Sequence, residues 1–374
     1  ININAHSPVN DGESVILNVG GIIGSAINTK LIAEGSTYNT ISKGKVDNSM
    51  SISNYSNSFN MGGAIGRITG LTNTNTSDNI YDMSNIQILT SELYDGNDAW
   101  QRFSATNCAN MTANIGGAVG YAENATFSNV YADTNWDIDN KNNATFNVGG
   151  LFGYINNSQN IDTMYAKGII KLNANNGINN VGGAFGQVVM ARSEEYSYSI
   201  NKVVADNDIK VTFETNNGTG NIGGFVGKIY NGVITKCSTT SDITVTGSDI
   251  SKVNLNVGGF VGITDITNEM GYLRNTKVRR ITINDCYATN DIDLAKMFIN
   301  STQHKAGLFI GTIETYIADT VDKTVDINNN YTIGKFVYST INTSAYEERE
   351  NKGGFLGGFN TNIDTLSYIS KLKN

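Results

Sequence analysis

Proline and charged residues are scarce in this chain. Its 374 residues include a single proline, Pro8, and only 16% are Asp, Glu, Lys or Arg. Proline cannot donate a hydrogen bond to a β-sheet, so its near-absence suits long, uninterrupted sheets. The low charge argues against a disordered chain, which combines high polarity with no apolar periodicity.

The charge that is present is mostly negative. The chain has 26 basic and 34 acidic residues, a net charge of −8. It lacks the basic stripe with which a protein displaces counterions from nucleic acid, so we expect no nucleic-acid partner. No run of 18 apolar residues occurs, so we expect no transmembrane segment. The start, Ile1-Asn2-Ile3-Asn4, is not a signal peptide, so we expect an exported protein to be present here as a processed piece.

Residues that carry chemistry are also few. Three cysteines cannot form a disulfide framework, and neither His6 nor His304 begins a His-Glu-x-x-His zinc motif. A Ser or Cys triad would need one of these two histidines as its base. The chain has no Gly-Gly-x-Gly-x-Asp calcium turn and no Gly-Lys-Ser/Thr phosphate loop. We therefore predict no enzyme activity, no cofactor and no metal site.

What the chain has instead is a repeat. One glycine-rich phrase recurs nine times, for example as Asn18-Val-Gly-Gly-Ile-Ile-Gly24 and Asn147-Val-Gly-Gly-Leu-Phe-Gly153. The eighth copy is degenerate, and we expect His304 to replace the leading asparagine there. The shortest step between copies is 33 residues. Units of this size cannot bury an apolar face alone and must stack on one another.

Two further phrases follow the first one in the better-preserved copies. The second reads Ile283-Asn-Asp-Cys-Tyr-Ala288, and the third alternates, as in Ile209-Lys-Val211. Three short strands per unit, separated by Asn, Gly and Ser turns, do not form an antiparallel sandwich. The sequence therefore predicts an all-β fold, a right-handed parallel β-helix of about nine coils with three short strands per coil. We expect one solenoid over 1–374, with less regular N-terminal coils (1–115) and a C-terminal end that is not capped within the chain.

Equivalent residues of successive coils should stack about 4.8 Å apart and form columns along the helix. Each column must therefore consist of residues that pack well against residues of the same type. The leading asparagine of the first phrase predicts a ladder, because a side-chain amide can accept from one neighbouring coil and donate to the other. Asparagine also tolerates left-handed turn geometry. The predicted ladder residues are Asn18, Asn60, Asn114, Asn147, Asn180, Asn221, Asn256 and Asn351.

Two other columns follow from the repeat. The second phrase aligns Val203, Cys237 and Cys286, which predicts that both thiols are small buried hydrophobes. The two apolar residues after Gly-Gly, as in Phe225-Val226, break the alternation of a strand. Either the glycine pair bends the chain so that both are buried, or one column faces outwards against a loop or a partner.

The phrases Gly-Gly-Phe-Val-Gly262 and Ile283-Asn-Asp-Cys-Tyr-Ala-Thr-Asn-Asp-Ile292 together resemble the GLUG repeat. The resemblance covers about residues 15–374. Two departures from that family are the frequent replacement of Cys by Val or Met and the length of the insertions. GLUG repeats occur in large bacterial surface proteins, including adhesins, autotransporter-like passengers and the non-catalytic region of immunoglobulin-A-cleaving metalloproteases. The resemblance implies a secreted or cell-surface adhesin, stalk or fibre subunit.

Such a protein would bind a receptor or glycan on a host or neighbouring cell, or a further copy of itself. The connection between the first and second phrases is longest in copies two, five, seven and eight. These insertions leave the same corner, so we expect 187–198, 263–280 and 312–325 to project together. Binding concentrates on variable loops of a rigid scaffold, which makes this corner the predicted binding site.

The insertion after copy seven is the best candidate for a binding loop. It contains the charged residues Glu269, Arg274, Lys277, Arg279 and Arg280. Carboxylates beside basic residues are also what a polysaccharide lyase or hydrolase needs. A polysaccharide-active enzyme or a carbohydrate-binding β-helix is therefore the alternative, with Trp100 and Trp136 to stack on sugars. A non-catalytic spacer of a larger surface protease is a further alternative.

Overall fold

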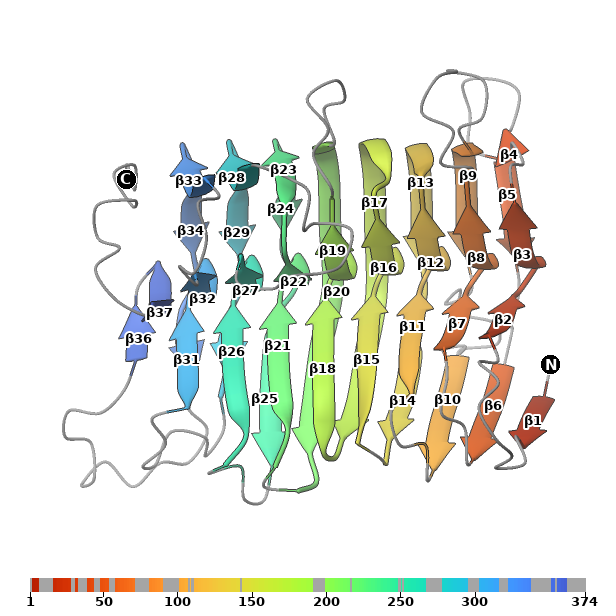
Figure 1. Cartoon of the computed structure of the whole chain (residues 1–374), viewed down its shortest axis with the longest axis horizontal. Helices are drawn as coiled ribbons and strands as arrows, with labels where there is room; N and C mark the ends of the chain where they lie inside the picture. Colours follow the sequence, from red (N-terminus) through yellow and green to blue (C-terminus); the bar gives the residue numbers. More distant parts are fainter. Residues whose placement is uncertain are drawn as a thin grey trace.

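The fold is a stack of β-strand coils. The computed structural model describes residues 2–6, 16–27, 31–32, 39–43, 48–53, 58–70, 81–89, 101–106, 108, 111–141, 143–190, 199–215, 217–247, 250, 252–266, 278–294, 303–315, 322–337, 351–353 and 355–361. All regular elements in these ranges are β-strands, and they pair in parallel. Successive coils lie side by side along the long axis of the molecule (Figure 1). The predicted parallel β-helix is confirmed.

The described strands form three parallel sheets, and the first phrase contributes to two of them. Sheet B holds the strands that end at its first glycine: β2 (Ile16–Gly20), β7 (Ser58–Gly62), β11 (Thr112–Gly116), β15 (Ala144–Gly149), β18 (Gly177–Gly182), β21 (Thr219–Gly223), β26 (Asn254–Gly258), β31 (His304–Gly307) and β36 (Asn351–Gly353). Sheet C holds the strands that follow the glycine pair: β3 (Ile23–Ile27), β8 (Ile65–Thr69), β12 (Val119–Glu123), β16 (Phe152–Asn156), β19 (Phe185–Val189), β22 (Val226–Ile229), β27 (Val261–Asp265), β32 (Ile310–Thr315) and β37 (Leu356–Thr361).

Sheet A holds the second and third phrases. Strands of the second phrase are β4 (Leu31–Ile32), β5 (Asn39–Lys43), β9 (Tyr81–Leu89), β13 (Ala125–Asp133), β23 (Gly232–Thr235), β24 (Ser238–Thr239), β28 (Val278–Asn284), β29 (Tyr287–Thr289), β33 (Asp322–Asn328) and β34 (Tyr331–Ile333). Strands of the third phrase are β1 (Asn2–His6), β6 (Asn48–Ser53), β10 (Gln101–Thr106), β14 (Trp136–Asn140), β25 (Ile243–Gly247), β30 (Ile292–Asp293) and β35 (Phe336–Val337). In two coils both phrases form one strand, β17 (Gln159–Ala174) and β20 (Ser199–Phe213).

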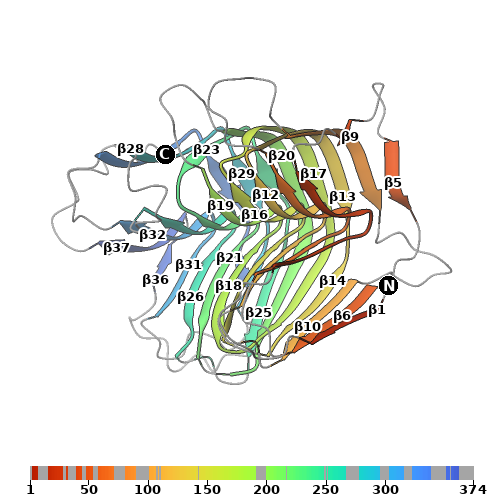
Figure 2. The same cartoon turned by 45° about the vertical axis from the view of Figure 1, so that its right-hand side comes forward.

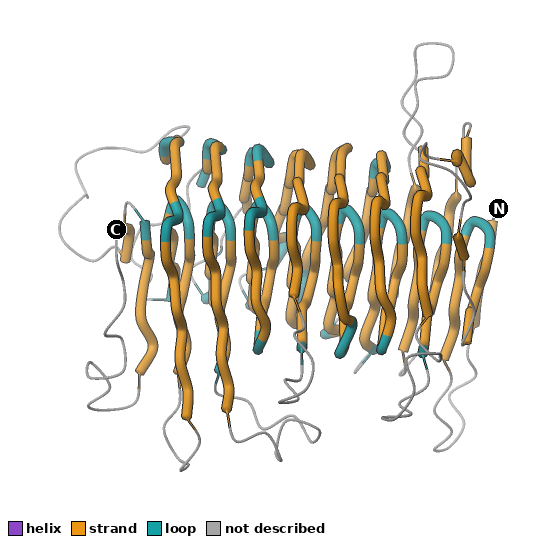
Figure 3. The backbone as a smooth tube through the Cα atoms, turned by 90° about the horizontal axis from the view of Figure 1, so that it is seen from above, coloured by secondary structure: helices purple, strands orange, loops and turns teal. Residues whose placement is uncertain are grey.

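Each coil has three sides, as predicted, but the three phrases do not correspond to one side each. The first phrase is two strands with a bend between them, and the second and third phrases share one sheet. Figure 3 shows the resulting coils side by side from above. The repeats stay in register through insertions: Asn147 pairs with Asn114 on one side and with Asn180 on the other. In coil two the second phrase lies in β9, with Met83 opposite Phe127.

The three glycines of the first phrase lie where a side chain has no room. A Cβ atom on Gly149 would lie 2.1 Å from Phe152 O, on the other side of the bend. One on Gly150 would lie 2.1 Å from the Gly183 carbonyl oxygen of the next coil. One on Gly153 would lie 2.3 Å from Ile115 N of sheet B. Backbone atoms of the same and of neighbouring coils lie close around this bend, which favours glycine, although Leu308 takes the place of the second glycine in the eighth copy.

A left-handed residue bends the second phrase in coils three to eight. The third position of the phrase has φ between 52° and 54° in Asn129, Thr163, Lys202, Lys236, Asp285 and Asn329. This turn separates two inward-pointing residues by two outward-pointing ones, which explains the spacing of the phrase. The ladder asparagines of the described residues do not use left-handed geometry, because they lie in extended strands.

Two apolar cores fill the coil. One lies between sheet C and the second-phrase strands, and the other lies between sheet B and the third-phrase strands. Figure 2 shows sheet C beneath the second-phrase strands β13, β17 and β20. Between the cores, buried polar residues of sheet A face the glycine bend; Asn290 Nδ2, for example, donates to Gly259 O at 2.8 Å.

In coils two to eight the bend buries both apolar residues that follow the glycine pair. Phe225 and Val226 are each 0% exposed and belong to the same core. In the later coils the first of the two residues is phenylalanine, and these rings stack on one another. Their centroids are 4.5 Å apart for Phe225–Phe260 and 4.9 Å apart for Phe260–Phe309. Of the two alternatives that the sequence left open, the one with both residues buried is correct.

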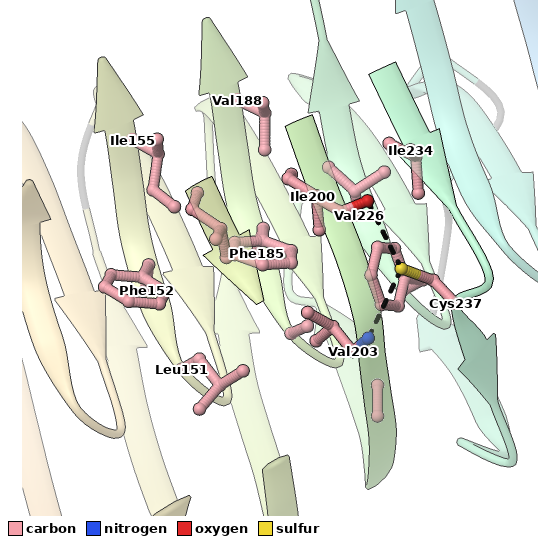
Figure 4. Packing of buried hydrophobic residues seen from close by; sticks show 14 of the residues in the cluster. Leu151, Phe152, Ile155, Phe185, Val188, Ile200, Val203, Val226, Ile234 and Cys237 are labelled. Carbon is pink, nitrogen blue, oxygen red and sulfur yellow. Dashed lines mark hydrogen bonds between the residues drawn. The ribbon is translucent and has the colours of Figure 1, made fainter. Parts of the chain in front are cut away.

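The column of the second phrase is also as predicted. Cys237 Sγ accepts a hydrogen bond from Val203 N at 3.4 Å, and Cys286 Sγ accepts one from Cys237 N at the same distance. Figure 4 shows Cys237 packed among Ile200, Val203 and Ile234. Both thiols are free and fully buried, and Cys108 is buried in the second core. The cysteines therefore act as small apolar residues.

Candidate functional site

The predicted asparagine column is a continuous ladder of side-chain hydrogen bonds. In each step, Nδ2 of one asparagine donates to Oδ1 of the asparagine in the preceding coil, at 2.7–2.8 Å. The asparagines joined in this way are Asn18, Asn60, Asn114, Asn147, Asn180, Asn221 and Asn256. Each amide thereby satisfies its neighbours in a column that would otherwise bury unpaired polar groups.

The ladder changes at the eighth copy. Asn256 pairs with Lys305, and Lys305 pairs with Asn351, whose side chain lies outside the described part. The prediction that His304 takes the ladder position is wrong by one residue. His304 instead points into the core, where it is 0% exposed and its Nε2 lies 3.0 Å from Ile250 O. An imidazole buried in this way is structural and is not available at the surface as a general base.

The ladder runs along the outer face of sheet B. Phe59 and Met61, on either side of Asn60, belong to the core, so the side chain of Asn60 points away from it. Asn60 is nevertheless only 2% exposed. An outward-pointing residue with so little exposure must be covered by another part of the chain.

Sheet C covers the ladder from the side. Asn180 Nδ2 also donates to Gln187 Oε1 of sheet C at 3.1 Å, and Thr312 Oγ1 donates to Asn256 Oδ1 at 2.5 Å. These contacts join the outer faces of sheets B and C. The two sheets therefore enclose a concave corner, and the ladder lines it.

The row of sheet C next to the ladder is chemically varied. In successive coils it reads Ser25, Arg67, Tyr121, Tyr154, Gln187, Lys228, Ile263 and Thr312. The Arg67 guanidinium lies 5.0 Å from the centroid of the Tyr121 ring, which stacks on Tyr154 at 5.2 Å. Burial and the charge of Glu123 raise the pKa of Tyr121. Glu123 in turn lies 3.8 Å from Arg67, so the cation is paired within the row.

A second charge pair lies further along the same face. Lys228 Nζ is 2.8 Å from Asp265 Oδ2 and 4.6 Å from the centroid of the Tyr230 ring. Burial lowers the pKa of Lys228, but Asp265 and Tyr230 outweigh this and leave it raised. Val189 and Tyr230 form a small apolar cluster beside the pair. The charges of Arg67 and Lys228 are each paired with a neighbouring carboxylate, so these two pairs stabilise the stack.

The connections from sheet C to sheet A differ widely between coils. In coil three the connection consists of Asn124 alone, and in coil four it consists of Asn157 and Ser158. Both asparagines have left-handed backbone geometry, with φ of 51° and 49°. In coils two, five, seven and eight the connection contains 71–80, 191–198, 267–277 and 316–321, which lie outside the described residues. The strand ends that bracket these insertions lie at one corner, as predicted, because all follow sheet C and all lead into the second phrase. The predicted ranges were too wide, since their edges belong to the strands of sheets A and C.

The predicted loop of charged residues is shorter than expected. Glu269, Arg274 and Lys277 lie outside the described residues. Arg279 and Arg280 are not in a loop but in β28, which pairs residue for residue with β33. The Arg280 guanidinium forms an ion pair with Asp326 of that strand. Sequence reasoning missed this because the second phrase marks only the later part of β28.

The aromatic residues offered for sugar stacking are not placed for it. Trp136 is 0% exposed and belongs to the core between sheet B and the third-phrase strands. Trp100 lies outside the described residues. The structure therefore brings none of the predicted sugar-binding residues together at a described surface.

No cluster of three or more His, Cys, Asp or Glu side chains in the described ranges is arranged to hold a metal ion. No described segment is a helix of the length and hydropathy needed to cross a membrane. Comparisons of the chain with protein-family models, curated proteins and solved structures find no match. The resemblance to the GLUG repeat stays a prediction that depends on the sequence phrases alone.

Proposed function

We propose that this chain is a non-enzymatic bacterial repeat protein, secreted or held at the cell surface, that acts as an adhesin, stalk or fibre subunit. In this proposal, its partner is a receptor or glycan on a host or neighbouring cell. One observation carries the proposal. Connections of unequal length follow sheet C at one corner of a rod whose strands stay in register from coil to coil. Rigid scaffolds with variable loops concentrate binding on those loops.

The rod supports this role through its rigidity. The ladder, the phenylalanine stack and the glycine bend all depend on neighbouring coils, so no coil can shift without breaking contacts on both sides. A surface that extends over several coils is then presented in one fixed arrangement. Such a scaffold suits a protein that must hold a binding site away from a surface.

The polysaccharide-active alternative gains no support from the geometry. Arg280 is bound to Asp326, and Trp136 is inside the core. The acidic pair Asp137 and Asp139 flanks buried Ile138, and Asp139 Oδ1 accepts from Asn173 Nδ2 at 2.7 Å. These groups stabilise the packing of neighbouring coils. We therefore prefer the binding function to the enzymatic one.

An adhesion assay tests the proposal. Microspheres coated with the chain should adhere to cultured epithelial cells. In the test variant, residues 191–198 are replaced by Ser-Gln, the pair that stands at the equivalent place in coil four after Asn157. This change leaves Met190, which is buried in the core, in place. We expect weaker adhesion at an unchanged melting temperature, with parallel variants for 267–277 and 316–321.

The matched control shortens 295–302, which connects sheet A to sheet B at another corner of the coil. That variant should adhere as well as the parent. Full adhesion by all three variants of the first corner would overturn the proposed binding site. Electron microscopy of the same samples distinguishes the two roles, because an adhesin forms isolated rods and a fibre subunit forms filaments.

A further inference from the structure

The chain contains three Asn-Gly steps: Asn176-Gly177, Asn217-Gly218 and Asn231-Gly232. In such a step the main-chain nitrogen of the glycine can attack Cγ of the asparagine. Ammonia leaves and a five-membered succinimide forms, which water then opens to aspartate or isoaspartate. Glycine favours the reaction because it has no side chain to obstruct the ring and adopts unusual backbone angles easily.

Two of these steps have the same local geometry. Asn217 Oδ1 accepts a hydrogen bond from Gly218 N at 3.0 Å, and Asn231 Oδ1 accepts one from Gly232 N at 3.0 Å. Both glycines have positive φ, 121° and 137°. The nucleophilic nitrogen is therefore held equally close to the side-chain amide in the two steps. Any difference in reactivity must come from their surroundings.

The surroundings differ sharply. Asn231 is 1% exposed, and its Oδ1 also accepts from Arg280 N of the next coil at 2.9 Å. Gly232 packs against the side chain of Met190, so water has no access from that side. Ring closure there requires breaking a bond between two coils and admitting water.

Asn217 has none of this protection. It lies at the corner between sheet A and sheet B, after the end of β20 and before the start of β21. Its side chain is exposed, and its Oδ1 is held by its own glycine. Water can take the proton from the main-chain nitrogen of Gly218, carry away the released ammonia and hydrolyse the ring. None of these steps requires the stack to open.

We propose that Asn217 is a site of spontaneous deamidation in the folded chain and that Asn231 is protected from the same reaction. The reaction consumes one water molecule and releases one ammonia, and it needs no other reactant. It replaces a neutral amide with a carboxylate at an exposed corner. The isoaspartate product also inserts a methylene group into the main chain, four residues before the ladder residue Asn221. This inference is independent of the proposed binding function.

Peptide mapping tests the proposal. The folded chain is incubated at mildly alkaline pH and physiological temperature, digested at intervals and analysed by mass spectrometry. Isoaspartyl methyltransferase labelling reports the isoaspartate product. We expect conversion at Asn217 to be at least about tenfold faster than at Asn231, because the latter must wait for a local opening. In denaturant, both steps should react at similar rates.

Equal rates for the two steps in the folded chain would overturn the proposal. So would an Asn217 that is stable in the folded chain but reacts in denaturant. An Asn217→Gln variant serves as the control, because the larger ring forms much more slowly. It should lose the acidic product from that peptide and keep the melting temperature of the parent. An acidic product that persists in this variant would assign the reaction to another residue and would also overturn the proposal.

Discussion

The side-chain Nδ2 of Asn221 lies 2.8 Å from Oδ1 of Asn180, although 41 residues separate them in the chain. The oxygen of Asn221 in turn accepts from Asn256 Nδ2 at 2.8 Å. Each ladder residue thus holds the coil before it and the coil after it. This relationship contributes to the register of neighbouring coils from outside the core.

Replacing one ladder residue should destabilise the fold. Asn221→Leu leaves the oxygen of Asn180 without its donor and the amide of Asn256 without its acceptor, both in a buried corner. We expect a loss of about 1–3 kcal/mol in the free energy of unfolding, measured by urea denaturation. The control is Asn254→Leu, on the same face of β26 but exposed. Equal losses in the two variants would contradict a role for the ladder.

The third glycine of the first phrase should be irreplaceable inside the stack. In Gly186→Ala the new Cβ would meet Val148 N at 2.4 Å and Gly153 O at 2.6 Å, both backbone atoms. We expect a loss of about 3 kcal/mol or more, at or beyond the upper end of ordinary overpacking. The same change at Gly24 meets only Asn18 O, at 3.0 Å. Gly24→Ala should therefore fold with a much smaller loss, and equal stability of the two variants would refute the argument.

The Lys228–Asp265 pair should matter through its burial. Asp265→Asn leaves a largely buried ammonium without its partner, at a cost of about 3–5 kcal/mol. The double variant Lys228→Met/Asp265→Leu removes both charges and should be more stable than the single variant. A double variant as unstable as Asp265→Asn would show that the charges themselves hold this face together.

The same pair predicts a pH dependence. The pKa of Lys228 is raised in the folded chain, so its contribution is complete below the ordinary lysine value of about 10.4. It is lost only as pH rises through the higher folded value. The stability difference between the parent chain and Lys228→Met should therefore stay constant from neutral pH to about 10 and shrink above it. A difference that shrinks near neutral pH would be inconsistent with a raised pKa.

The thiols of the second-phrase column should be inert. Burial, and then the neighbouring Cys286, raise the pKa of Cys237 well above its ordinary value, so little thiolate forms at mildly alkaline pH. Iodoacetamide should leave Cys237 and Cys286 unmodified in the folded chain and label both in denaturant. A mass that corresponds to a bridge between these two residues would contradict the prediction.

Most of the fold could be predicted from the repeat phrases of the sequence. A column such as Asn114, Asn147 and Asn180 could be predicted because identical residues recur at a fixed place in each phrase. The bend was harder, because two buried residues in a row, such as Phe225-Val226, are compatible with two arrangements until the backbone contacts of the glycines are seen. His304 was misplaced because the eighth copy lacks both its asparagine and one glycine, so the phrase alone could not fix its register.

The site was less predictable than the fold. Which face the ladder occupies depends on the angle between sheets B and C, and no phrase encodes that angle. Lys228 and Asp265 are on different coils and 37 positions apart, so their pairing has no local signal in the sequence. Arg280 looked like a loop residue because the strand begins before its recognisable phrase does.

The ladder also has an electrical direction. Every amide from Asn60 to Asn256 donates towards the preceding coil and accepts from the following one, so their dipoles point the same way and reinforce one another. As in an α-helix, aligned dipoles leave partial negative charge at the end where the acceptors point. At that end the hydroxyl of Thr312 donates to Asn256, and the cationic residue Lys305 takes the next place in register. The exchange of asparagine for lysine in the eighth copy therefore sets a positive charge at the negative pole of the column.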